Sequence, residues 1–164
     1  MAKVSAVPPT IRTYRVPGAI LRDSVETLRT LSRGSKESVV LWQGKVLDED
    51  TAEITHLVVP KQLTGPYHFN VPLAERLALI AKVSEHNEFI LIQLHTHPQQ
   101  AFHSPADDEM AITKHQGAIS IVVPYFGRHW QGSFEDTSVH INLGNATWRQ
   151  LTLSEVAGLL EVVA

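Results

Sequence analysis

The feature that most constrains the fold of this chain is a largely apolar segment that ends in two histidines and a proline. The segment Phe89 to Leu94 indicates a buried strand, and His95 and His97 follow it with one residue between them. Side chains two residues apart in a strand point to the same side, so both imidazoles can converge on one ion. Pro98 ends the strand, because it has no N–H to offer a neighbouring strand.

A helix start follows after a short polar loop. Ser104 suits the N-cap, Pro105 the first helical position, and Asp107 and Asp108 the first turn. A carboxylate in this turn could face the two imidazoles as a third ligand. Two nitrogens and one oxygen predict a zinc site with an open fourth position, which is the arrangement of a hydrolytic metal centre.

An isolated pair of histidines is more often a surface or packing feature than a metal site. The buried strand before this pair, the proline after it and the S-x-x-D helix start favour metal binding. The chain has nine histidines, and those outside the pair show no ligand spacing. His103 lies in the loop and could touch the site, although a solvent-facing position is the simpler expectation.

Composition narrows the class of protein. At 164 residues the chain is expected to form one domain, residues 1–164, with residues 1–10 as a loose N-terminal arm. A formal charge of −3, with acids and bases interspersed, gives no sign of a nucleic-acid partner. The sequence has no apolar run long enough for a transmembrane helix and no signal peptide, so neither a membrane partner nor export is expected.

The chain also has no cysteine. This excludes disulfides and thiolate chemistry, fits a cytoplasmic protein, and limits the ligands of any metal site to His, Asp and Glu.

Hydrophobic periodicity predicts the remaining elements. Further strands are expected over residues 11–16, 37–44, 51–59, 118–124, 129–134 and 139–143. Helices are expected over 19–31, 71–86 and 105–115, a loop over 60–70, and a helix or an edge segment over 153–163. The second helix is expected to bury Leu73, Leu77, Ile80 and Ser84. Strands that alternate with helices in one domain indicate an α/β or α+β fold with a mixed sheet.

The segment His95-Thr-His97-Pro98, followed by Ser104-Pro-Ala-Asp107, resembles the signature of the JAMM (MPN-plus, JAB domain) metalloproteases. The family pattern is H-x-H-P, a short loop and S-x-x-D, with a glutamate on a much earlier strand. Glu37 fits that glutamate, because it opens an apolar strand that reaches Gly44. The resemblance covers residues 19–127 and implies a single-domain JAB/MPN fold, which is cytidine-deaminase-like: a mixed central sheet flanked by helices.

The resemblance also implies roles for individual residues. His95, His97 and Asp107 would hold Zn²⁺, Glu37 would act as general base, and Ser104 would donate a hydrogen bond to the oxyanion. Without the resemblance, Glu37 would be interpreted as a solvated strand-edge residue and Ser104 as an N-cap only.

Two departures from the family pattern are visible in the sequence. The loop before Ser104 is about one residue shorter than in many members, which leaves Asp108 as an alternative ligand. Asp107 is preferred because it keeps the S-x-x-D relation. Val39 and Val40 replace the glycine often found inside the glutamate strand, which bears on packing more than on chemistry.

Family members usually cleave isopeptide or peptide bonds at the C-terminus of ubiquitin or a ubiquitin-like protein. This compact chain resembles the small stand-alone bacterial type, some of which resemble partners of ubiquitin-like conjugation systems in defence operons. Three classes of function therefore stay open. They are a zinc isopeptidase with a ubiquitin-like substrate, a zinc hydrolase of the same fold for small amino-acid conjugates, and a scaffold that has lost catalysis. The oligomeric state is not indicated.

Overall fold

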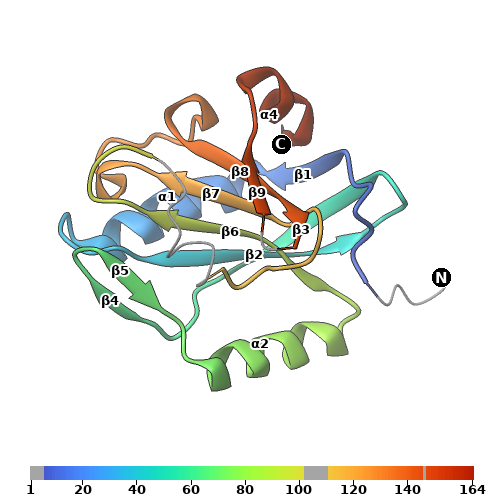
Figure 1. Ribbon diagram of the computed structural model, residues 1–164, viewed down its shortest axis with the longest axis horizontal. Coiled ribbons are helices and arrows are strands. Elements are labelled where there is room, and N and C mark those ends of the chain that lie inside the picture. The colour runs from blue at the N-terminus through green and yellow to red at the C-terminus, as the bar shows by residue number, and fades with distance from the viewer. Residues whose placement is uncertain (1–5, 102–110, 146) are drawn as a thin grey trace.

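The computed structural model describes residues 6–101, 111–145 and 147–164. These residues form an eight-stranded mixed sheet in the order β10-β1-β3-β2-β6-β7-β8-β9, and a separate hairpin of β4 and β5 (Figure 1). The strands are β1 (Thr13–Pro17), β2 (Val39–Val46), β3 (Thr51–Val58), β4 (Leu63–Gly65), β5 (His68–Asn70), β6 (Phe89–Thr96), β7 (Ile119–Val123), β8 (Ser138–Gly144), β9 (Thr147–Gln150) and β10 (Leu160–Val163). The helices are α1 (Gly18–Ser32), α2 (Leu73–Glu85) and α4 (Leu153–Leu159).

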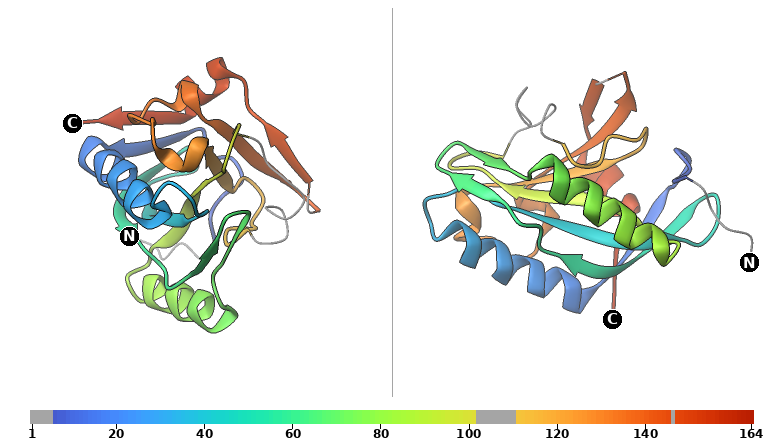
Figure 2. Two further views of the ribbon diagram at one scale, coloured as in Figure 1. Left: turned by 90° about the vertical axis from the view of Figure 1, so that its left-hand side faces the viewer. Right: turned by 90° about the horizontal axis from the view of Figure 1, so that it is seen from below.

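The two long helices cover opposite faces of the sheet, α1 on one side and α2 on the other (Figure 2). The mixed α/β fold expected from the sequence is therefore confirmed. β6 lies inside the sheet, antiparallel to β2 and parallel to β7. Its residues from Ile90 to Thr96 are all buried, because both its faces and both its edges are covered. None of the helices in the described part of the chain is long and apolar enough to cross a membrane.

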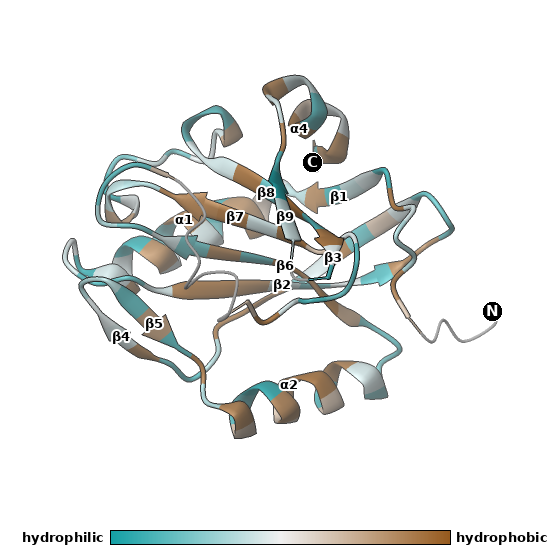
Figure 3. Cartoon of the chain, in the orientation of Figure 1, coloured by the Kyte–Doolittle hydropathy of each residue, from teal (hydrophilic) through white to brown (hydrophobic). Residues whose placement is uncertain are grey.

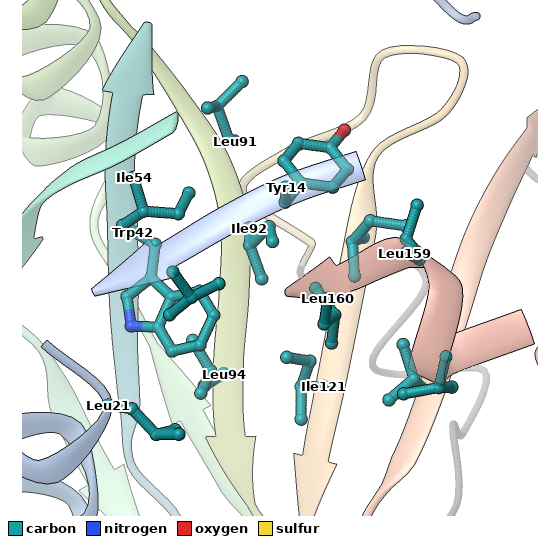
Figure 4. Packing of buried hydrophobic residues seen from close by; sticks show 14 of the residues in the cluster. Tyr14, Leu21, Trp42, Ile54, Leu91, Ile92, Leu94, Ile121, Leu159 and Leu160 are labelled. Carbon is teal, nitrogen blue, oxygen red and sulfur yellow. The ribbon is translucent and has the colours of Figure 1, made fainter. Parts of the chain in front are cut away.

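The larger core lies between the sheet and α1. The side chains of α1 that face it, Leu21, Ser24, Leu28 and Ser32, recur at helical spacing. Leu21 and Leu28 belong to the same core cluster as the sheet residues Trp42 and Leu94. Figure 4 shows Leu21 beside Trp42 and Leu94. Tyr14 on β1 is 1% exposed in the same cluster, and this burial raises the pKa of its phenol above the ordinary value.

The smaller core lies under α2 and corrects one expectation. Leu73, Leu77 and Ile80 are 61%, 58% and 47% exposed, and Ser84 is exposed as well. The helix instead turns Val83 and Leu79 toward the sheet, where they join a cluster of buried residues that includes Val39, Leu41, Phe69, Val71 and Ile90. Apolar residues occur all around α2 (Figure 3), so periodicity did not select the packed face.

Several expected boundaries also differ. The predicted loop over 60–70 contains the β4–β5 hairpin. Residues 129–133 form no strand, because Trp130 folds back and its Nε1 donates a 2.8 Å hydrogen bond to the carbonyl of Ser133. A short 3-10 helix, η2 (Phe134–Asp136), follows. The unexpected strand β9 pairs with β8 across a turn in which Gly144 and Asn145 have positive φ, a Gly-Asn signal present in the sequence.

The structure also specifies the two ends of the domain. Residues 153–163, expected to be a helix or an edge segment, contain both. The helix α4 is followed directly by the edge strand β10, which pairs with β1. Val7 packs against the core and the Thr10 hydroxyl donates a 2.7 Å hydrogen bond to the carbonyl of Glu49, so residues 6–10 are attached to the domain. The helix expected over 105–115 is absent from its described part, 111–115, and the rest lies outside the described residues.

Gly44 marks a β-bulge in β2. The registers of β2 with β6 and with β3 shift at Trp42–Gln43 and at Gln43–Gly44, so the backbones approach closely here. A Cβ at Gly44 would collide with the carbonyl oxygen of Glu53 and lie 2.9 Å from Leu91 Cδ1. The requirement for glycine at this position is therefore steric.

We expect Gly44→Ala to lower the free energy of unfolding by about 1–3 kcal/mol, because main-chain atoms cannot move aside as a flexible side chain would. Urea denaturation measures this change. Gly158→Ala in α4 is the matched control, because a Cβ there meets nothing within 4 Å. It should be neutral or stabilising by up to about 1 kcal/mol. Equal stabilities of the two variants would contradict the steric explanation.

Candidate metal centre

The two histidines of the H-x-H-P motif lie together at the end of β6. His95 and His97 are 0% and 3% exposed, and their ring centroids are 5.1 Å apart with the rings tilted by 54°. His95 lies in an interior strand that pairs on both sides, and His97 follows directly after that strand. Two adjacent buried imidazoles of this kind fit two of the protein ligands of a tetrahedral zinc site.

Glu37 lies on the same face of the sheet. Val39 pairs with His95 in the β2–β6 ladder, and the Thr96 amide donates a 2.9 Å hydrogen bond to the carbonyl of Ser38. One further step along both strands places Glu37 opposite His97, with its side chain on the face of the imidazoles. Glu37 is only 5% exposed, so the alternative of a solvated strand-edge residue is wrong.

The β4–β5 hairpin holds the glutamate end of β2. Beyond the end of β3, the side-chain amide of Gln62 bonds to β2 in place of a strand. It accepts a hydrogen bond from the Val39 amide and donates one to the Val39 carbonyl, both at 2.9 Å. The carbonyl of Gly65 then accepts a 2.7 Å hydrogen bond from the Glu37 amide. The Phe69 ring lies 5.3 Å from the His95 ring, centroid to centroid. The hairpin thus positions Glu37 and covers one imidazole.

The segment after β7 holds the other side of the site. The His97 amide donates to the carbonyl of Val123 at 2.8 Å, and the Phe126 amide donates to the His97 carbonyl at 2.7 Å. Tyr125 and Phe126 both have φ of 55°, a left-handed conformation that costs about 1–3 kcal/mol per non-glycine residue. This strained turn, Tyr125–Gly127, therefore fixes the backbone of His97.

The remaining site residues expected from the sequence, Ser104 and Asp107, lie outside the described residues, as do His103 and the alternative ligand Asp108. Over residues 6–101, 111–145 and 147–164, no group of three His, Cys, Asp or Glu side chains gathers to hold an ion. The third ligand and the oxyanion donor therefore stay predictions.

Sequence reasoning missed the residues that support the site. Phe69 and Gln62 fall in a segment expected to be a loop, and a side-chain amide that replaces a strand partner leaves no sequence signal. Thr96 did have a signal, because alternation along the strand places it on the face opposite the two imidazoles.

Comparisons with known proteins found a curated relative and solved structures. No family model matches the sequence. A curated protein, the probable metalloprotease y4jG of Sinorhizobium fredii, is 26% identical over 162 residues, which cover 94% of this chain and 96% of that protein. The name of this relative agrees with the metalloprotease class that the H-x-H-P and S-x-x-D motifs resemble. The match extends over nearly the whole chain.

Among solved structures, protein DSY2949 from Desulfitobacterium hafniense matches with a TM-score of 0.62 and 12% identity, over 92% of this chain and 94% of that one. That match shows a shared fold. AF2198, a JAB1/MPN domain protein from Archaeoglobus fulgidus, matches with a TM-score of 0.49 and 14% identity, over 92% of this chain and 99% of that one.

We expect purified protein to contain close to one zinc ion per chain, and His95→Ala and His97→Ala each to lose most of it, because a three-ligand site does not survive the loss of an imidazole. Elemental analysis measures the content. His129→Ala, which changes an exposed histidine, is the control and should keep its zinc. Full zinc in both strand variants would exclude this site.

The third ligand is tested separately. Asp107→Asn should lose zinc and Asp108→Asn should keep it, since an amide is a much weaker zinc ligand than a carboxylate. The opposite result would move the ligand by one residue.

Proposed function

We propose that this chain is a JAMM-type zinc metallopeptidase that cleaves at the C-terminus of a ubiquitin-like protein. The observation that carries the proposal is the contact of two buried imidazoles, His95 and His97, at the end of β6, with the buried Glu37 opposite His97 in the extended register of β2 and β6. The H-x-H-P motif and the y4jG relative, which is named a probable metalloprotease, support the metallopeptidase class.

The residues of this chain would divide the chemistry as follows. His95, His97 and Asp107 would hold the zinc ion, which when bound supplies a water of lowered pKa and polarises a carbonyl. Glu37 would take the proton of the attacking water and pass it to the leaving amine. Ser104 would donate a hydrogen bond to the oxyanion.

A groove under α2 could hold an extended substrate. It has a volume of about 740 Å³, lies between β3 and α2, and is lined in part by Val58, Val59, Lys61, Leu79 and Lys82. Its β3 wall leads directly into the hairpin whose Gly65 carbonyl holds Glu37. The flexible tail of a ubiquitin-like protein is a chain that could lie extended in such a groove, with this hairpin at its end.

Two alternative functions remain: one has a different substrate, and the other has no catalytic activity. A hydrolase of small amino-acid conjugates would use the same residues. A non-catalytic scaffold would have no need for a glutamate buried beside two imidazoles. By resemblance to the small stand-alone bacterial proteins, we place the substrate in a bacterial ubiquitin-like conjugation system of the kind found in defence operons.

We expect Glu37→Gln to keep zinc and fold while the rate of cleavage falls by about two orders of magnitude or more, the usual contribution of a positioned general base. Single-turnover kinetics measure the rate. Glu26→Gln, on the exposed face of α1, is the matched control and should leave it unchanged. Near-normal turnover in Glu37→Gln would remove this residue from the mechanism.

The substrate is tested with fusions of ubiquitin-like proteins to a reporter, and in parallel with small acyl-amino-acid conjugates. We expect cleavage immediately after the ubiquitin-like tail, abolished by a chelator and restored by zinc. Mass spectrometry of the products locates the cleaved bond. Turnover of the small conjugates, with none of the fusions across several tails, would favour the small-molecule hydrolase.

A further inference from the structure

A cluster of three buried hydroxyl groups lies directly behind the candidate site. Ser32 at the end of α1, Ser38 next to Glu37, and Thr96 between the two histidines are all 0% exposed. The Ser32 hydroxyl lies 2.6 Å from the Ser38 hydroxyl and 2.9 Å from that of Thr96. The three side chains therefore form one hydrogen-bonded group on the α1 face of the sheet, opposite the face of the imidazoles.

The Thr96 side chain replaces one main-chain hydrogen bond between the segments of β2 and β6. The Ser38 amide donates a 2.9 Å hydrogen bond to the Thr96 hydroxyl oxygen, while the Thr96 amide donates to the Ser38 carbonyl at 2.9 Å. In a regular antiparallel pair, a main-chain carbonyl would accept the first of these bonds. The position of Ser38 against β6 thus depends on a side chain.

The imidazoles and the glutamate are not held in the same way. His95 pairs with β2 and β7, and His97 is held by Val123 and Phe126 through main-chain bonds. Glu37 lies two residues before Val39, the first residue of β2, and its main chain is fixed by the Gly65 carbonyl and through its neighbour Ser38. Loss of the Thr96 hydroxyl would therefore release the glutamate more than the imidazoles.

We propose that Thr96 is a positioning residue. Together with Ser32 and Ser38, its hydroxyl sets the distance of the Glu37 carboxylate from the metal ligands without touching the substrate. The inference rests on the proposed function, since it assigns Glu37 the role of general base. It adds that the middle residue of the H-x-H motif controls the base from the opposite face of the sheet.

The test compares Thr96→Val, which removes the hydroxyl but keeps the shape, with Thr96→Ser, which keeps the hydroxyl. Ser24→Ala is the matched control: Ser24 is another buried α1 serine, whose hydroxyl accepts from Trp42 Nε1 at 2.8 Å and donates to Ile20 at 2.7 Å, away from the site. The four measurements are zinc affinity by chelator competition, kcat, KM, and amide hydrogen exchange of Glu37, Ser38 and His97.

In Thr96→Val we expect kcat to fall about tenfold to a hundredfold, the scale of a small misplacement of a catalytic group, with KM and zinc affinity unchanged. The Glu37 and Ser38 amides should exchange faster and the His97 amide should not. Thr96→Ser should restore kcat, and Ser24→Ala should lower stability without changing kcat. Should Thr96→Val not fold, Ser32→Ala, which removes the hydroxyl that contacts the other two but leaves the bond from the Ser38 amide to Thr96, should show the same pattern at smaller size.

Unchanged kcat and unchanged exchange of Glu37 and Ser38 in Thr96→Val would overturn the inference. A parallel loss of zinc affinity would also overturn it, because Thr96 would then act on the ligands. If the wild-type protein cleaves none of the substrates, the proposed function fails. The exchange rates still decide whether the Thr96 hydroxyl positions Glu37.

Discussion

The pairing of the start of β2 with the end of β6 is the interaction on which the rest of the structure depends. It brings together residues that are 58 positions apart, Ser38 and Thr96, and with them the two neighbouring segments of the site. Alternation then divides the pair into two faces. One face presents a glutamate and two imidazoles, and the other presents hydroxyl groups and the apolar core under α1.

Helix α1 supports both sides of this pairing. Ser32 reaches the hydroxyl group behind β2 and β6. Less than one turn earlier, Arg29 donates hydrogen bonds to the carbonyls of Gly127 and Trp130, at 3.4 Å and 2.9 Å. These bonds help to offset the conformational strain of the turn that holds His97. A helix without any ligand or base thereby fixes the geometry of the site from behind.

The sequence could predict features that depend on neighbouring residues. The H-x-H spacing places both imidazoles on one side of a strand, and this convergence is present in the structure. Glu37 needed the family resemblance, because no local signal states which strands pair or in which register. The packed face of α2 could not be chosen, since leucines and isoleucine on its exposed side match the same period as Leu79 and Val83. The left-handed conformation of Tyr125 and Phe126 could not be predicted from the sequence, because aromatic residues rarely adopt positive φ.

The burial of Tyr14 has a consequence for alkaline solution. Its phenol is neutral in the core and its pKa is raised by burial, so ionisation favours the unfolded chain. The stability that this group contributes is complete below the pKa of an unfolded tyrosine and declines as the pH rises above it. The other two tyrosines, Tyr67 and Tyr125, are 81% and 46% exposed. In a variant with Tyr67 and Tyr125 changed to phenylalanine, Tyr14 is the one tyrosine left. The ultraviolet absorbance of its ionised phenol at alkaline pH would then report the opening of the core around β1.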